Sequence, residues 1–541
     1  MKELSRRGFV VAASLAGVGV ATRAFPHNDG GHHGGGGGGK LAFLHGVASG
    51  DPLHDRVILW TRVTPKRNDD AVLVKWSIAR DPRMKREECG GRVWTDASRD
   101  FTVKVDADRL EPNRTYYYQF EVNGARSPIG RTKTLPLFHA RSVRFAVASC
   151  SNYPYGFFQV YRRIAERADL DFVLHLGDYI YEYANGQYGD GASIGRLVKP
   201  DHEILSLTDY RQRHATYKTD PDLQEAHRQH PFITVWDDHE TANDSWHDGA
   251  ENHNPLLGEG EWETRKRVAI KAYFEWMPIR EFAWKPKSQI YRVFRYGNLA
   301  EIDMLDTRLY GRDQQAASPA DVATINDPSR QLLGVEQESW LFNRLYQSQS
   351  QGVKWRVLGQ QVMMAQLSAS RGASVLNVDQ WDGYAPARER LFRHIGDNNI
   401  DNVVVLTGDI HSSWGSDLAS NPYDAAQYDP VTGRGSVGVE LVTPGVTSPG
   451  IEDPAAAAEQ AAGLRFLSPH MKFIELNKRG YVVVDIDRDR MQSEWWHVPT
   501  IRERTNVQSL AAILANASGT NHLVPATESL ATSDSAPDPA P

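Results

Sequence analysis

The feature that most constrains this chain is a short apolar run that leads to a glycine and an acidic side chain, and the sequence contains it twice. In residues 171–183 the run leads to Asp178, and in residues 403–411 it leads to Asp409 and His411. Short continuous apolar runs are typical of buried strands in a parallel sheet. The carboxyl ends of such strands are where open α/β sheets bind ligands. Two such ends side by side would form a site for two metal ions.

The length and composition indicate a globular protein of more than one domain. A chain of 541 residues is too long for one ordinary core, so we expect two domains with tails. Hydrophobic residues make up 40% and charged residues 24%, and after the N-terminus no apolar run approaches membrane-spanning length. The formal net charge of −7 argues against a general nucleic-acid binder. With only Cys89 and Cys150, disulfides are not what holds the fold together, although one bridge is possible.

The N-terminus predicts export. Arg6 and Arg7 precede an apolar segment, residues 11–21, and small residues follow it. This pattern resembles a twin-arginine signal peptide, which we place at residues 1–24; a mature amphipathic helix would need polar residues along the apolar segment. Residues 25–40 are rich in glycine and histidine and predict a flexible linker. We therefore expect export through the twin-arginine machinery, a periplasmic or extracellular location and no transmembrane segment in the mature protein.

Residues 41–138 have the pattern of a small antiparallel β-sandwich. Runs rich in β-branched and aromatic residues alternate with turns such as Asn123-Gly124. Residues 110–118 resemble the tyrosine corner of fibronectin type III-like modules. We expect this domain to carry no catalytic residues.

After the sandwich the pattern changes to alternating strands and helices. A strand that ends at Cys150, an amphipathic helix and the strand before Asp178 form a β-α-β unit, so both residues are expected at one edge of a parallel sheet. Further apolar runs supply enough strands for two stacked sheets flanked by helices, and we assign residues 139–504 to this domain. Residues 505–541 are interpreted as a weakly structured tail that begins with a weak helix, residues 507–514.

Polar clusters follow the predicted strand ends in four places. Carboxylate and amide oxygens suit calcium, magnesium or manganese, whereas thiolate, phenolate and imidazole suit a transition metal. The mixture indicates two unlike ions, which together can generate a hydroxide nucleophile and neutralise charge on a phosphoryl oxygen. Asp178, directly after the glycine, is best placed to bridge them. The clusters are Cys150, Asp178 with Tyr181, residues 237–244, and Asp409 with His411.

Several of these residues also have a purely structural explanation. Cys150 alone could be a buried small residue or a disulfide partner of Cys89, and the tyrosines after Asp178 could be packed loop aromatics. His239 could cap a helix, and His175, in the middle of a strand, fits a core position better than a ligand. Packing does not explain why a glycine and an ionisable residue follow both apolar runs.

Four segments combine these clusters with their flanking strands: residues 177–181, 235–240, 358–361 and 407–412. Together they resemble the PhoD-type alkaline phosphatases of the metallophosphoesterase superfamily. Residues 46–52 and 57–62 are similar to the N-terminal β-domain of that family, and the resemblance covers about residues 43–498. The linker and the Pro/Ala-rich tail lie outside the family pattern.

The resemblance implies an α/β fold: a four-layer αββα metallophosphoesterase domain preceded by the fibronectin type III-like sandwich. It also implies one ferric ion and calcium as cofactors, and activity on phosphate esters at alkaline pH. The residues it assigns to iron are Cys150, Asp178, Tyr181 and His411.

For calcium, the resemblance implies Asp178, Asp409 and one residue of the third cluster. Asp238 occupies the usual ligand position before His-Glu, while Asn243 offers a neutral oxygen, and both alternatives stay open. His239 would orient the substrate or protonate the leaving alkoxide. Either Arg267 or Arg280 would clamp the phosphate bidentately.

We therefore expect an exported, monomeric phosphomonoesterase and phosphodiesterase in which a metal-activated hydroxide attacks phosphorus in line, without a covalent phosphoenzyme. Its partners would be phosphate ester substrates and the twin-arginine export machinery. One alternative is a phospholipase D-like phosphodiesterase that acts on phospholipids. A second, from a different class, is a non-catalytic secreted metal- or phosphate-binding protein.

Overall fold

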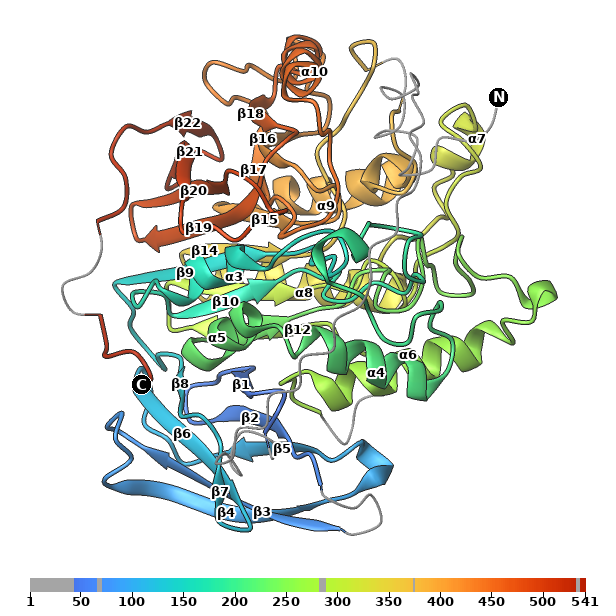
Figure 1. Cartoon of the computed structure of the whole chain (residues 1–541). Coiled ribbons are helices and arrows are strands. Elements are labelled where there is room, and N and C mark those ends of the chain that lie inside the picture. The colour runs from blue at the N-terminus through green and yellow to red at the C-terminus, as the bar shows by residue number, and fades with distance from the viewer. Residues whose placement is uncertain (1–42, 66–70, 282–288, 373–374, 532–535) are drawn as a thin grey trace.

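Two large sheets face each other and a smaller sheet lies against one end of the molecule (Figure 1). The computed structural model describes residues 43–65, 71–281, 289–372, 375–531 and 536–541. The predicted signal peptide and the Gly/His-rich linker lie outside the described residues. Within the described residues, no helix is both long enough and apolar enough to cross a membrane.

The larger sheet has ten strands in the order β22-β21-β20-β19-β9-β10-β11-β1-β2-β5. β9, β10, β11 and β1 are parallel neighbours, and antiparallel strands extend the sheet on both sides. The bounds are β1 (Val47–Gly50), β2 (Val57–Arg62), β5 (Thr102–Ala107), β9 (Ser142–Ala148), β10 (Phe172–His175), β11 (Pro231–Thr234), β19 (Arg479–Asp487), β20 (Arg490–Val498), β21 (Ser509–Ala517) and β22 (Leu523–Pro525).

The second sheet has seven strands in the order β12-β13-β14-β15-β17-β16-β18. Its central strands β13, β14, β15 and β17 are parallel. The bounds are β12 (Arg292–Tyr296), β13 (Ala300–Met304), β14 (Trp355–Gly359), β15 (Val403–Thr407), β16 (Ser413–Ala419), β17 (Ser436–Val442) and β18 (Met471–Glu475).

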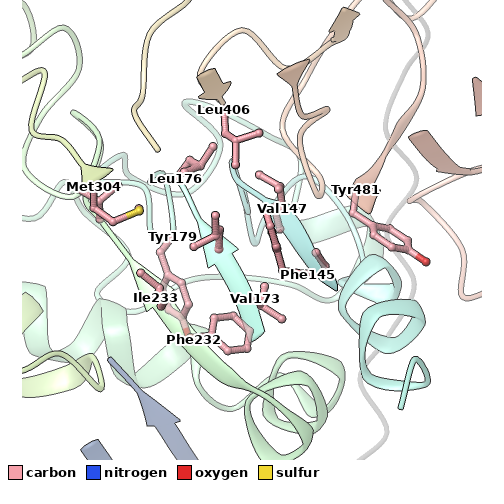
Figure 2. Close-up of a cluster of buried hydrophobic side chains, with 14 of the residues drawn as sticks. Phe145, Val147, Val173, Leu176, Tyr179, Phe232, Ile233, Met304, Leu406 and Tyr481 are labelled. Carbon is pink, nitrogen blue, oxygen red and sulfur yellow. The ribbon is translucent and has the colours of Figure 1, made fainter. Parts of the chain in front are cut away.

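The main core lies between these two sheets. In Figure 2, Val147 of β9 and Leu176, just after β10, are drawn with Met304 of β13 and Leu406 of β15, and all four are buried in one hydrophobic cluster. Burial of this apolar surface supplies the dominant favourable term of folding. The sheets therefore form the two inner layers of the domain.

Helices cover the outer face of each sheet, which completes the expected four-layer αββα arrangement. α4 (Leu207–Tyr217) ends before Asp220, whose side chain caps α5 (Pro221–Gln229), and Pro221 occupies the first turn of α5. On the side of the larger sheet lie α3 (Gln159–Ala165), α4 (Leu207–Tyr217), α5 (Pro221–Gln229) and α6 (Trp262–Trp276); on the other lie α8 (Val335–Ser350), α9 (Ala385–Asp397) and α10 (Pro454–Leu467). The short elements are α7 (Val322–Ile325) and the 3₁₀ turns η1 (Ala97–Arg99), η2 (Ala192–Ile194), η3 (Pro255–Leu257) and η4 (Trp381–Tyr384).

The N-terminal segment forms the predicted sandwich with its own core, and Tyr116 makes the predicted corner because its hydroxyl accepts the backbone N–H of Glu111 at 2.8 Å. One face of the sandwich is not separate, however: β1 pairs with β11 in parallel, so the larger sheet runs through both domains. The other face consists of β3 (Val72–Ala79), β4 (Glu87–Thr95), β6 (Thr115–Val122), β7 (Ala125–Arg126) and β8 (Gly130–Lys133).

The weak helix predicted over residues 507–514 is wrong. The structure has strand β21 there, and it pairs with β20 through partners such as Ser493 and Leu514. The segment expected to begin a weakly structured tail is thus part of the larger sheet. Farther on, Ala540 is buried and exchanges two hydrogen bonds with Gln229 of α5.

Candidate metal centre

The polar clusters of the sequence meet where strands of the two large sheets end. Cys150, Asp178 and Asp409 follow β9, β10 and β15, and all three have positive φ angles, of 61°, 54° and 66°. Non-glycine residues rarely adopt this conformation, and such strained residues cluster at active sites. Gly177 is required for a different reason: a Cβ on it would lie 2.5 Å from the backbone nitrogen of Asp237.

Three groups of potential metal ligands lie within this cluster, and the ligand atoms of each group lie within 4.8 Å of one another. Two groups share Asp178, and two share Asp238. All the members are buried. The first group is Cys150, Asp178 and His411, the second is Asp178, Asp238 and His239, and the third is Asp237, Asp238 and Asp409.

Tyr181 joins the first group. Its hydroxyl lies 2.9 Å from Asp178 Oδ2, 3.3 Å from His411 Nε2 and 2.6 Å from Ser448 Oγ. Burial, and next the negative charge of Asp178, raise the pKa of this phenol well above its ordinary value. His411 Nδ1 donates to the carbonyl of Pro449 at 2.8 Å, which leaves Nε2 as the ring nitrogen that faces the group.

His239 is held by Glu182, because its Nδ1 lies 2.7 Å from the Glu182 Oε2 atom. Burial alone lowers the pKa of His239, but the charges of Glu182, Asp238 and Asp178 outweigh it and raise that pKa to about 10. The rings of Tyr181 and Tyr183 lie 4.3 and 5.5 Å from the imidazole. A protonated imidazole beside the carboxylates can donate a proton to a leaving oxygen.

Glu240 fixes the backbone that carries these ligands. Its carboxylate accepts the backbone N–H groups of Asp178 at 3.0 Å and Asp237 at 2.7 Å. One buried side chain therefore ties the turn after β10 to the turn after β11.

The two alternatives in the third cluster are placed differently. Asp238 belongs to two of the ligand groups. The side-chain amide of Asn243 donates to Glu251 at 3.0 Å, and its backbone N–H donates to Glu182 at 2.8 Å. These contacts leave both Asp238 and the amide oxygen of Asn243 as candidate ligands.

In the described part of the chain, neither of the two arginines that were predicted to clamp phosphate makes an observed contact with the cluster. Arg267 is exposed on α6. Arg280 forms an ion pair with Asp106 and donates to the carbonyl of Asp51, so it joins the sandwich to the domain of the two large sheets. Their role in phosphate binding stays a prediction that these contacts do not support.

The structure tests two of the purely structural explanations considered for these residues, a disulfide at Cys150 and a core position for His175. Cys89 and Cys150 form no disulfide, since Cys89 lies on β4 of the sandwich. His175 is buried and bonded through Nε2 to the Tyr161 hydroxyl at 2.8 Å, as expected of a core histidine.

Sequence reasoning missed Arg308 and Asp379. Arg308 is completely buried, and its guanidinium forms ion pairs with Asp237, Asp379 and Asp409. No apolar run marks this position, because β13 reads Ala-Glu-Ile-Asp-Met, unlike the apolar β15 before Asp409.

Comparisons with known proteins match the chain to one phosphatase family. The sequence profile of the family described as PhoD-like phosphatase matches residues 145–495, and that of its N-terminal domain matches residues 36–136. Alkaline phosphatase D of Bacillus subtilis (strain 168) is 38% identical over 480 residues, which span 85% of this chain and 78% of that protein. The solved structure titled "Structure of PhoD" is 36% identical, with a TM-score of 0.81 over 91% of this chain and 93% of that one.

Proposed function

The chain belongs to the PhoD-like phosphatase family and is a phosphoester hydrolase, and from this premise we propose that it cleaves phosphate monoesters and diesters at one ferric and one calcium ion. The observation that carries the proposal is the position of Asp178, whose carboxylate belongs to two ligand groups at once. A shared carboxylate is what a pair of neighbouring metal ions requires.

The donor atoms fit two unlike ions. The thiol of Cys150, the phenol of Tyr181 and the imidazole of His411 suit a transition metal, with Asp178 as the carboxylate. Asp238 and Asp409 add the hard oxygens that calcium prefers. When bound, such a pair supplies an activated oxygen nucleophile and neutralises charge on the phosphoryl group.

The residues of the chain do the rest of the work. His239, held by Glu182, protonates the leaving oxygen. The hydrogen bond from His411 to the Pro449 carbonyl fixes the orientation of that imidazole. The buried position of these side chains excludes water and strengthens each electrostatic contact.

Export is part of the proposal. Arg6 and Arg7 with the apolar segment after them support a twin-arginine signal peptide at residues 1–24, followed by the linker at residues 25–40. We expect the enzyme to act as a monomer, either in the periplasm or outside the cell.

Elemental analysis of natively exported protein is the test of the cofactors. We expect iron and calcium in the purified protein, loss of activity with EDTA and recovery with added calcium. Tyrosinate bound to ferric iron should also give the protein a violet or brown colour. Colourless, active protein would argue against Tyr181 as an iron ligand.

A substrate series separates the phosphatase from a phospholipase D-like enzyme. Turnover of nitrophenyl phosphate, bis-nitrophenyl phosphate and phosphatidylcholine is compared on one preparation. We expect the first two to dominate, and dominant cleavage of phosphatidylcholine would favour the phospholipase.

A pair of variants tests the non-catalytic alternative, which family membership already disfavours. Deletion of residues 26–40 should leave hydrolysis unchanged, and Asp409→Ala should abolish it. A binding protein that relied on the linker histidines would give the opposite result.

A further inference from the structure

Arg308 lies at the centre of the acidic side of the cluster. Its Nε is 2.5 Å from Asp237 Oδ1, and its Nη2 is 2.9 Å from Asp409 Oδ1 and 3.7 Å from Asp238 Oδ1. These three aspartates are the whole of the third ligand group. One guanidinium therefore contacts every member of that group.

The first ligand group is supported by different residues. Tyr181 and Ser448 form a hydrogen-bonded chain to Asp178, and the Pro449 carbonyl orients His411. Apart from Glu240, which ties the two turns together, the two sides of the site are supported by different side chains, so a change in Arg308 should affect them unequally.

Asp379 holds Arg308 through Nη1, whereas the other three aspartates face Nε and Nη2. Its two carboxylate oxygens accept from Arg308 Nη1 at 2.8 and 2.9 Å. Asp379 is itself fixed by Arg312 at 2.6 Å and Gln315 at 2.7 Å. The planar guanidinium is thereby locked, and an arginine fork in this state imposes one geometry on its partners.

The backbone that carries Arg308 is fixed as well. The Arg308 N–H donates to Asp306 Oδ1 at 2.9 Å, and both the N–H and the hydroxyl of Thr307 donate to Gln361 Oε1. The turn after β13 is thus tied to residues just beyond β14. The Arg308 guanidinium therefore keeps its position even if a carboxylate that it contacts moves.

We infer that Arg308 is a positioning residue that holds Asp238 and Asp409 ready for the second metal ion, with Asp237 and Asp379 as its anchors. The inference rests on the proposed function, because it concerns the calcium side of that site. Without a cation, carboxylates this close repel one another. The guanidinium neutralises them and fixes the oxygen of Asp409 that faces it.

Two effects of Arg308 on the second ion oppose each other. Its positive charge repels another cation, so charge alone predicts tighter calcium binding when the arginine is removed. Removal also deprives the buried carboxylate of Asp237 of this ion pair and leaves Asp379 held only by Arg312 and Gln315, which destabilises and disorders the site. We expect the second effect to win, since loss of an outer partner of a metal ligand typically lowers metal affinity about 10- to 100-fold.

The experiment measures calcium affinity and iron content separately. Arg308→Gln should raise the calcium dissociation constant about 10- to 100-fold in equilibrium dialysis, with iron per chain unchanged. Arg308→Lys keeps the positive charge but loses the forked guanidinium. Its calcium dissociation constant should lie between that of Arg308→Gln and that of the natural protein. Asp379→Asn loosens Arg308 and removes no member of a ligand group. It should also raise the calcium dissociation constant, but by less than Arg308→Gln does.

Arg292→Gln is the matched control, because Arg292 makes a comparable buried fork to Asp51 in a different part of the fold. It should lower stability and leave the calcium dissociation constant unchanged. If Arg308→Gln does not fold, Arg308→Lys and Asp379→Asn carry the test. Unchanged or tighter calcium binding in the folded variants overturns the inference, whereas a natural protein that binds neither metal overturns the proposed function.

Discussion

The two ends of the same parallel strands handle charge in opposite ways. At the amino ends, Arg144 pairs with Asp169 at 2.5 Å and Asp485 at 2.8 Å, and Lys133 pairs with Asp171. These residues line a cavity of about 530 Å³ and are partly open to solvent. At the carboxyl ends the carboxylates outnumber the cations, and nearly every side chain is completely buried.

The difference shows that charge balance, and not the size of a cavity, identifies the functional end of the sheet. A buried carboxylate is costly unless it is paired or binds a metal. At the amino ends each carboxylate has a basic partner, so the charges are explained by stability. At the carboxyl ends Arg308 and His239 are too few for the acidic groups around them, which is the arrangement expected where metal ions complete the site.

The largest expected effect is at the carboxylate shared by two ligand groups. Asp178→Asn should lower kcat/KM for nitrophenyl phosphate by at least about 1000-fold, more than the loss of an outer-shell partner would cause. The matched change at the other end, Asp171→Asn, should leave kcat/KM within about twofold. Circular dichroism of both variants checks the fold, and a folded Asp178→Asn enzyme with a tenth of normal activity would break the comparison.

A second effect concerns the charge on His239 in the metal-free protein. Its pKa is raised in the folded state from 6.5 to about 10, so the stabilisation from its pairing with Glu182 is present below pH 6.5 and is lost as the pH rises through about 10. Glu182→Gln should therefore lower the free energy of unfolding by roughly 2 kcal/mol or more near neutral pH.

Urea unfolding at several pH values, with the chelator present, checks this prediction. The difference between Glu182→Gln and the natural protein should narrow as the pH approaches 10. A difference that stays constant over this range would show that the pairing does not hold a proton on His239.

The next effect is smaller and lies near the amino ends. Residues 536–541 receive hydrogen bonds from Tyr117 and Arg131 of the sandwich and from Arg228 and Gln229 of α5. Deletion of these residues should lower the free energy of unfolding by about 1–2 kcal/mol, which lowers the melting temperature by a few degrees. The value of kcat/KM should not change. A large loss of activity would show that the two ends of the sheet are coupled.

The smallest effect is expected for the ion pair between Lys133 and Asp171, whose side chains are 28% and 11% exposed. Asp171→Asn should lower the free energy of unfolding by no more than about 1 kcal/mol, and the loss should shrink in high salt. A loss as large as that of Glu182→Gln would remove the contrast between the two ends.

Much of the catalytic fold could be predicted because its signals are local. The apolar runs before Asp178 and Asp409 indicated strands, and the β-α-β rule brought Cys150 to the same edge. The structure places these residues together as expected. The prediction for segment 507–514 is wrong because its apolar residues suit either a helix or a strand, and only pairing with β20 and β22 decides between them.

The remaining site residues depend on contacts between distant segments. Arg308 and Asp379 are separated by 71 positions and meet only in the folded chain. Arg267 and Arg280 looked suitable because arginine binds phosphate, yet type alone does not reveal which arginine faces the cluster. Asp238 and Asn243 are too close in sequence for spacing to distinguish them.

The most direct test of the central claim is anomalous diffraction from crystals of the natively exported protein, with data collected at the iron edge and at a wavelength where calcium scatters. We predict an iron peak bonded to Cys150, Asp178, Tyr181 and His411, and a calcium peak bonded to Asp178 together with Asp238 and Asp409. Peaks that share no ligand at Asp178, or a single ion remote from it, would contradict the account.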